Sequence, residues 1–100
     1  MKHALAGRDP GVPTIVLAHQ PRAASEAIEW KDVHLVLCGH THGGQMMPFT
    51  FSVYLIQPFF VGLYEPKPSV FVYVSPGTKY YLFPVRHWFY PEITLITIYN

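Results

Sequence analysis

Apolar runs of strand length flank an alanine-rich segment in the first part of the chain. Residues 13–18 (PTIVLA) are rich in β-branched side chains and uncharged, a pattern typical of a strand buried on both faces. Residues 22–30 (RAASEAIEW) consist mainly of helix formers and place Ala24, Ala27 and Ile28 on one face. Residues 33–38 (VHLVLC) are a second apolar run. The pattern therefore predicts a strand, a short helix and a second strand.

The length of the connection between the two strands predicts their relative direction. It has about the dozen or more residues that a crossover between parallel strands needs, and far more than a hairpin uses. The carboxyl ends of parallel strands lie at one edge of a sheet, where open α/β sheets bind their ligands. His19 ends the first strand, and His40 and His42 follow the second. We therefore expect these three imidazoles at the same edge of the sheet.

The second half of the chain contains two more apolar runs of strand length, residues 70–74 (VFVYV) and 93–99 (ITLITIY). Both alternating faces of residues 93–99 are apolar, as in a strand of a covered or sandwich sheet. Residues 46–63 carry no charge, but Pro48 and Pro58 would leave backbone groups unpaired inside a bilayer. We expect a buried or membrane-facing loop there, and no clear transmembrane helix.

The composition limits the size of the fold and the choice of partner. A chain of 100 residues forms one domain at most, or part of one. Only 13% of the residues are charged, against about 25% in an average soluble domain, so much of the chain is expected to pack against something else. The net charge of +1, without a basic cluster, argues against nucleic acid as a partner. The single cysteine, Cys38, excludes an intrachain disulfide, and the first residues lack the apolar run of a signal peptide.

Residues 39–45 (GHTHGGQ) carry the clearest chemical signal in the sequence. Imidazole binds divalent metals, and the flanking glycines let the backbone aim each ring at a cation. An ordinary polar turn is one alternative interpretation. A mononuclear metal-binding module built from His19, His40 and His42 alone is another. A two-metal phosphate site also needs carboxylates, and the acidic residues of this chain are not expected in these loops.

Three other side chains are weaker candidates for the site. Arg86 offers bidentate donors that suit a phosphate, although a surface or strand-capping arginine is the simpler interpretation. Gln20 and Gln45 follow candidate ligand histidines and would orient them through hydrogen bonds, or are simply loop amides.

The segments "TIVLAHQP", "LVLCGHTHGGQ", "GLYE", "YVSPGT" and "FPVR…PEITLITI" resemble the calcineurin-like metallophosphoesterase superfamily. The resemblance is strongest to the branch with transmembrane members and bacterial lipid-linked relatives, which implies association with a membrane. It also implies an α/β fold, part of a four-layer α/β/β/α sandwich, and two divalent metal ions (Mn, Fe or Zn). By this resemblance His19 and His40 would bind the second metal and His42 the first. His40 and His42 would thus belong to the catalytic site, where a metal-bridging hydroxide attacks phosphorus.

The resemblance also implies that residues 1–100 are the carboxyl-terminal part of a single phosphoesterase domain. The Gly-Asp-x-x-Asp and Gly-Asn-His motifs of the family's first half do not occur here. The missing amino-terminal half is therefore an expected partner, and the chain alone is expected to be inactive. The expected substrate is a phosphorylated small molecule or a phospholipid, with membrane contact through residues 46–63. The alternative is a catalytically incomplete binding or regulatory fragment that associates with a membrane or a partner chain.

Overall fold

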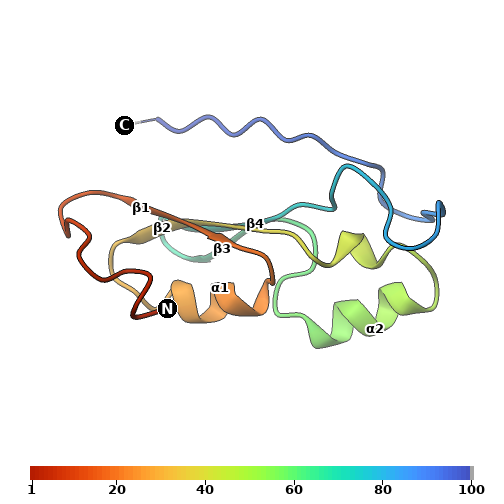
Figure 1. Ribbon diagram of the computed structural model, residues 1–100, viewed down its shortest axis with the longest axis horizontal. Coiled ribbons are helices and arrows are strands. Elements are labelled where there is room, and N and C mark those ends of the chain that lie inside the picture. The colour runs from red at the N-terminus through yellow and green to blue at the C-terminus, as the bar shows by residue number, and fades with distance from the viewer. Residues whose placement is uncertain (100) are drawn as a thin grey trace.

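The computed structural model describes residues 1–99 of the chain (Figure 1). The elements follow in the order β1 (Thr14–Ala18), α1 (Arg22–Ala27), β2 (Val33–Cys38), the 3-10 turn η1 (His42–Gly44), α2 (Phe49–Ile56), β3 (Gly62–Lys67) and β4 (Val70–Val74). The two strands and the helix predicted in the first part of the chain are confirmed, with the helix ending three residues earlier than expected. The strand predicted at residues 70–74 is also confirmed.

The strands form one mixed sheet in the order β1-β2-β4-β3. β2 is the centre of its parallel part, since it pairs in parallel with β1 on one side and with β4 on the other. β3 pairs antiparallel with β4 as a hairpin and forms the edge. Sequence patterning missed β3, because Glu65 and Pro66 interrupt its apolar residues, as an edge strand tolerates. The predicted parallel crossover and the α/β class are confirmed, while the four-layer sandwich stays a prediction.

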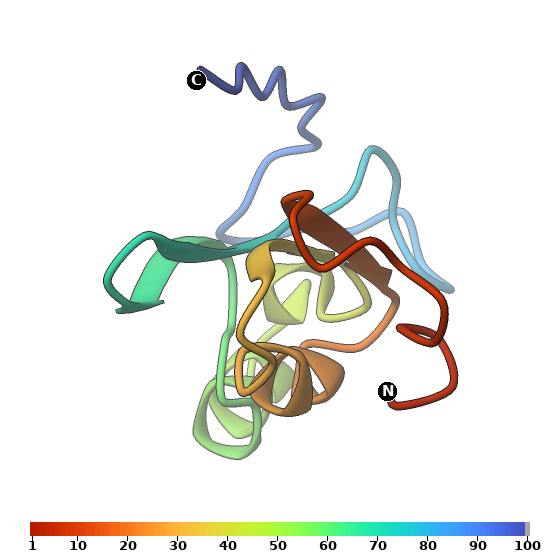
Figure 2. The same ribbon diagram turned by 90° about the vertical axis from the view of Figure 1, so that its left-hand side faces the viewer.

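Only one face of the sheet is covered by helix. α1 packs Ala24 and Ala27 against a core that includes Val36 and Val72, all fully buried. Figures 1 and 2 place α1 and α2 on this side of the sheet and the carboxyl-terminal segment on the other. On the face away from α1, Leu17 of β1 is 78% exposed. The prediction that β1 is buried on both faces is therefore wrong, because no helix among residues 1–99 covers the second face.

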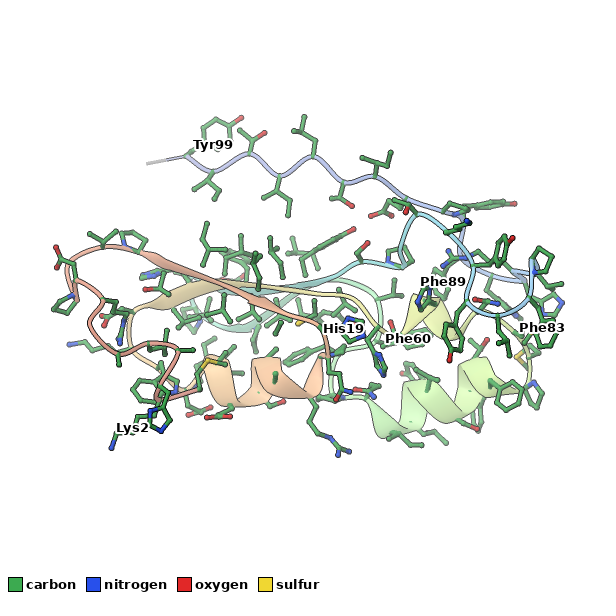
Figure 3. The ribbon with its side chains drawn as sticks, in the orientation of Figure 1. Lys2, His19, Phe60, Phe83, Phe89 and Tyr99 are labelled. Carbon is green, nitrogen blue, oxygen red and sulfur yellow. The ribbon has the colours of Figure 1, made fainter. Side chains whose placement is uncertain are left out.

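Residues 93–99 do not form the predicted strand. They run as an extended chain over the uncovered face of the sheet (Figures 1 and 3), but no strand among residues 1–99 pairs with them. Tyr73 of β4 anchors the start of this segment, where its hydroxyl group donates a hydrogen bond to the Glu92 carboxylate and lies 2.6 Å from the Thr94 hydroxyl. The pattern correctly indicated an extended conformation, but hydrogen-bond pairing depends on a neighbouring strand.

The uncharged segment at residues 46–63 contains a helix where a loop was expected. α2 begins after Pro48, a position that tolerates the missing N–H of proline, and ends at Ile56. None of its residues is buried, and its exposed side chains include Phe49, Phe51 and Leu55. Among residues 1–99, none of the helices combines the length and the apolar character needed to cross a bilayer.

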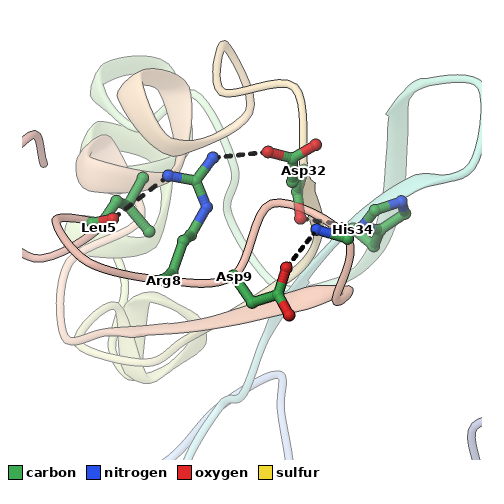
Figure 4. Close-up of polar contacts among 6 residues, drawn as sticks. Leu5, Arg8, Asp9, Asp32 and His34 are labelled. Carbon is green, nitrogen blue, oxygen red and sulfur yellow. Dashed lines mark hydrogen bonds and ion pairs between the residues drawn. The ribbon is translucent and has the colours of Figure 1, made fainter.

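The amino-terminal segment packs at the end of the sheet where β2 begins, opposite the end that carries the histidines. The Arg8 guanidinium donates to the Asp32 carboxylate at 2.7 Å and to the Leu5 carbonyl at 3.3 Å (Figure 4). Leu5 is itself part of the core. These contacts fix the start of the chain beside the entrance of β2, far along the strand from the loop that follows Cys38.

Candidate metal centre

His19 and His40 meet at the carboxyl edge of the parallel strands. Beyond the ends of β1 and β2, the Gly39 N–H donates to the His19 carbonyl at 3.1 Å, which carries the pairing of the two chains past the strands. The two rings are consequently adjacent, with His40 Nδ1 3.0 Å from His19 Nε2 and the rings edge to face. Figure 3 shows His19 at this end of the sheet, between the two helices. The predicted convergence of these two imidazoles is confirmed.

The spacing of these two nitrogen atoms suits a shared divalent cation. Two imidazole nitrogens this close could bind one divalent cation together after small adjustments of the rings. Without a cation, the same spacing is one hydrogen bond in which one ring donates and the other accepts. Both side chains are exposed, so an ion could reach them directly from solvent. Residues 1–99 thus provide two adjacent donors for one metal.

His42 does not join this pair. Its ring lies beside the Tyr81 ring, with the centroids 6.0 Å apart, and its Nδ1 faces Gly77. That nitrogen is buried and has no hydrogen-bond partner among the described residues. Within residues 1–99, no cluster of three His, Cys, Asp or Glu side chains has the geometry to hold a metal. The donors present therefore fit two positions of a metal site, and the ligand role of His42 stays a prediction.

Arg86 connects loops of the chain to one another. Its guanidinium donates to the carbonyl groups of Phe89 at 3.1 Å, His42 at 3.4 Å and Pro76. These bonds tie the chain after β4 to the histidine loop. They use three of the five N–H donors of the guanidinium, and the buried Nε has no partner among the described residues, so the contact with phosphate stays a prediction.

The two glutamines differ in their surroundings. Gln45 is buried, and its amide bonds to the backbone of the aromatic segment: Nε2 donates to the Tyr81 carbonyl at 2.7 Å and to the Phe83 carbonyl at 3.0 Å, while Oε1 accepts from the Tyr81 N–H at 2.6 Å. Gln45 therefore positions residues 81–83, whereas the prediction had it orient a histidine. Gln20 is exposed beside His19.

Two other groups with metal-binding chemistry lie near the strands without joining the site. One Asp-x-His triplet occurs in the chain, Asp32-Val33-His34, but it lies where β2 begins, at the opposite end from His19 and His40. Cys38 is 6% exposed, and burial raises the pKa of its thiol to about 11. Among the described residues, Cys38 belongs to no cluster of three potential metal ligands.

An apolar cavity of about 360 Å³ borders the histidine loop. Its lining is built from the loop after His40, helix α2 and the aromatic segment, and comprises Thr41, His42, Gly44, Gln45, Met46, Phe49, Val53, Tyr81, Leu82 and Phe83. Sequence analysis did not predict it, because segments about forty residues apart enclose it. In the sequence, the abundance of aromatic residues in both segments is the feature that could have indicated this cavity.

The fold is an α/β fold with two imidazoles at the carboxyl ends of parallel strands, and over nearly its whole length the chain is similar to proteins named metallophosphoesterases. It is 48% identical over 99 residues to the Transmembrane protein with metallophosphoesterase domain of Bos taurus, and 46% identical over 99 residues to that of Danio rerio. An uncharacterized metallophosphoesterase of Helicobacter pylori is 42% identical over 95 residues.

The chain corresponds to only part of each of these relatives. The matches cover 98%, 98% and 95% of this chain, but 22%, 23% and 26% of the relatives' own length. No family model matches the chain. No solved structure matches it either.

Proposed function

We propose that this chain supplies part of the metal site of a metal-dependent phosphoesterase, which hydrolyses phosphate ester or pyrophosphate bonds. The observation that carries this proposal is the contact between His40 Nδ1 and His19 Nε2 at 3.0 Å, at the carboxyl edge of parallel strands. The similarity of the chain to proteins named metallophosphoesterases supports it independently. The remaining ligands, carboxylates among them, would come from a further part of the domain.

The residues of this chain have defined tasks in the proposal. His19 and His40 would hold one of two divalent ions (Mn, Fe or Zn), and their rigid strand ends would fix its position. When bound, divalent ions neutralise developing charge on the phosphate oxygens and stabilise the displacement at phosphorus. Arg86 and Gln45 would keep the loop at residues 40–45 in place through their bonds to backbone carbonyls. His42, whose buried Nδ1 has no partner among the described residues, would bind the other ion.

The surroundings of the site favour an amphipathic substrate and a membrane location. α2 carries no charge and exposes Phe51, Leu55 and Ile56 to solvent, next to the histidine loop. Two relatives carry the word transmembrane in their names. The proposal therefore includes contact between residues 46–63 and a membrane surface, with a phospholipid or another phosphorylated small molecule as substrate.

The test compares the 100-residue chain with a form extended upstream to a whole domain. Metal content and turnover of p-nitrophenyl phosphate and bis-p-nitrophenyl phosphate are measured with added Mn²⁺. We expect two ions and turnover in the extended form only. His40→Ala should lower that turnover at least about 100-fold, since even the supporting partners of metal ligands cost 10–100-fold. His34→Ala, an exposed histidine at the other end of β2, is the matched control and should retain activity.

A second candidate function is a catalytically incomplete binding or regulatory fragment. The observation in its favour is that residues 1–99 bring together two potential ligands and no cluster of three. In this case the extended form would bind no metal and turn over neither ester. That result would overturn the phosphoesterase proposal, and binding to vesicles or to a partner chain would become the activity to measure.

A further inference from the structure

The cavity beside the histidine loop has an almost wholly apolar wall. Met46, Phe49 and Val53 line it from the segment of α2, and Leu82 and Phe83 line it from the aromatic segment. No Asp, Glu, Lys or Arg contributes to the lining. The volume of about 360 Å³ falls within the range of small-molecule pockets, which is about 300–1,000 Å³. Phe49, Leu82 and Phe83 are each more than half exposed, so the cavity opens to the surface.

Thr41 and Gln45 bond their polar groups within the protein, while the buried Nδ1 of His42 has no partner among the described residues. Thr41 donates its hydroxyl hydrogen to the Phe60 carbonyl at 2.8 Å. Both donors of the Gln45 amide bond to carbonyl groups of residues 81 and 83, and its oxygen accepts from Tyr81 N–H. A sugar or nucleobase in this cavity would lose its hydrogen bonds to water and find few free protein partners, which is unfavourable. The wall therefore selects an apolar group.

The cavity is built together with the metal-binding loop. Thr41, His42 and Gly44 belong to its wall and directly follow His40. Gln45 joins this loop to residues 81–83 by three hydrogen bonds, which hold the two sides of the cavity at a fixed distance. Leu82 has a φ of 63°, a conformation that a leucine rarely adopts and that is concentrated at ligand-binding segments. The cavity thus borders the loop that follows His40, while His19 and His40 themselves lie outside its lining.

We propose that this cavity binds the hydrocarbon chain of a phosphate ester, so that the substrate class is an amphipathic alkyl or acyl phosphate. This inference rests on the proposed function, because His19 and His40 would direct the phosphate end of the same molecule. Burial of the chain against Met46, Phe49 and Val53 supplies affinity in proportion to its length. Each added methylene that enters the cavity should tighten binding about fourfold, until the cavity is filled.

The test measures binding by calorimetry with n-dodecyl phosphate, n-butyl phosphate and 1-decanol. The protein is tested first without metal, so that binding is measured apart from hydrolysis. Val53→Trp fills the cavity from α2, and Leu55→Trp is the matched control, since Leu55 lies on the same helix outside the lining. We expect dodecyl phosphate and decanol to bind at least about tenfold more weakly to Val53→Trp, and unchanged to Leu55→Trp.

A second pair of variants tests the cavity independently, in case Val53→Trp prevents folding. Leu82→Asp places a charge on the cavity wall at an exposed position where aspartate tolerates the positive φ, and Tyr80→Asp is its neighbour outside the lining. Leu82→Asp should weaken decanol binding while Tyr80→Asp does not. Equal binding of butyl and dodecyl phosphate, or equal effects within either pair, would overturn the inference.

Hydrolysis by the extended form then separates the two proposals. If p-nitrophenyl phosphate is hydrolysed but chain length has no effect on binding, the phosphoesterase proposal stands and the hydrocarbon site is refuted. If decanol binds in the cavity and no ester is hydrolysed, the phosphoesterase proposal fails, and with it the assignment of the cavity to a substrate. Chain-length dependence in both binding and kcat/KM supports the inference in full.

Discussion

Several residues of the loop after β2 have backbone conformations that L-amino acids rarely adopt. His40, His42 and Gln45 have φ values of 70°, 49° and 33°. Such residues cost about 1–3 kcal/mol each and persist where the surrounding structure holds them. Here the hydrogen bonds of Gln45 and Arg86 provide that support. The loop is therefore stabilised from outside itself, at the point where the candidate ligands emerge.

Gly44 is the position in this loop where a side chain is least tolerable. Its φ is +67°, and a Cβ atom there would lie 2.4 Å from the Thr50 Cα of α2. We predict that Gly44→Ala lowers the free energy of unfolding by at least about 1–2 kcal/mol, measured by denaturant titration. Gly39→Ala is the matched control, since a Cβ at Gly39 meets no atom within 4 Å. Equal stability of the two variants would contradict the close packing of the loop on α2.

At the scale of elements, the fold depends on which segments pair with a strand or pack against a helix. β1, β2 and β4 pair along their length, and α1 covers one of their faces. α2 contacts the histidine loop without burying any of its own residues. Residues 93–99 have the composition of a strand and are held only at their start, where the Glu92 N–H donates to the Gly77 carbonyl at 3.0 Å. That anchor decides where the segment runs.

We predict that Tyr73→Phe loosens this anchor, because it removes the hydroxyl group shared with Glu92 and Thr94. Amide hydrogen exchange at Glu92 should accelerate about three- to tenfold, and Tyr80→Phe should leave it unchanged.

Hydrogen bonds from Thr94 and Tyr73 lower the pKa of Glu92 below its ordinary 4.5. Burial, followed by the bond to Glu92, raises the pKa of Tyr73 above 10.0.

The sign of the pH dependence follows from these two directions. The contribution of Glu92 is complete above pH 4.5 and is lost as the pH falls through its lowered pKa. The contribution of Tyr73 is complete below pH 10.0 and is lost as the pH rises through its raised pKa. Protection of the Glu92 amide, corrected for intrinsic exchange, should therefore be greatest between these limits. Protection that increases on acidification would refute the anchor.

For the molecule as a whole, the dominant feature is an apolar sheet face without a covering layer. On this face, Leu17 of β1 is 78% exposed and Leu63 of β3 is 67% exposed. A further cavity of about 470 Å³, lined mostly by apolar side chains, lies between this face and residues 96–99. Apolar patches of this kind drive association. The low charged fraction of the sequence is explained by this surface and by the exposed face of α2.

We predict that the 100-residue chain by itself self-associates through this face. In sedimentation velocity, the double variant Leu17→Lys/Leu63→Lys should shift most of the protein to the monomer. Val12→Lys/Tyr80→Lys adds the same charge at exposed positions outside the face and should have little effect. If both variants disperse the chain equally, net charge and not the uncovered face controls its association.

Local pattern and connection length alone determined the strand–helix–strand unit, its parallel direction and the convergence of His19 with His40. These features depend on residues close in sequence and on the geometry of a crossover, which a single sequence contains. The helix at residues 49–56, the separation of His42 from the pair and the hydrocarbon-sized cavity were decided by the tertiary structure. Each depends on contacts with distant segments: α2 with the histidine loop, His42 with Tyr81, and Gln45 with residues 81–83. The pairing of residues 93–99 needs a neighbouring strand, which local composition does not provide.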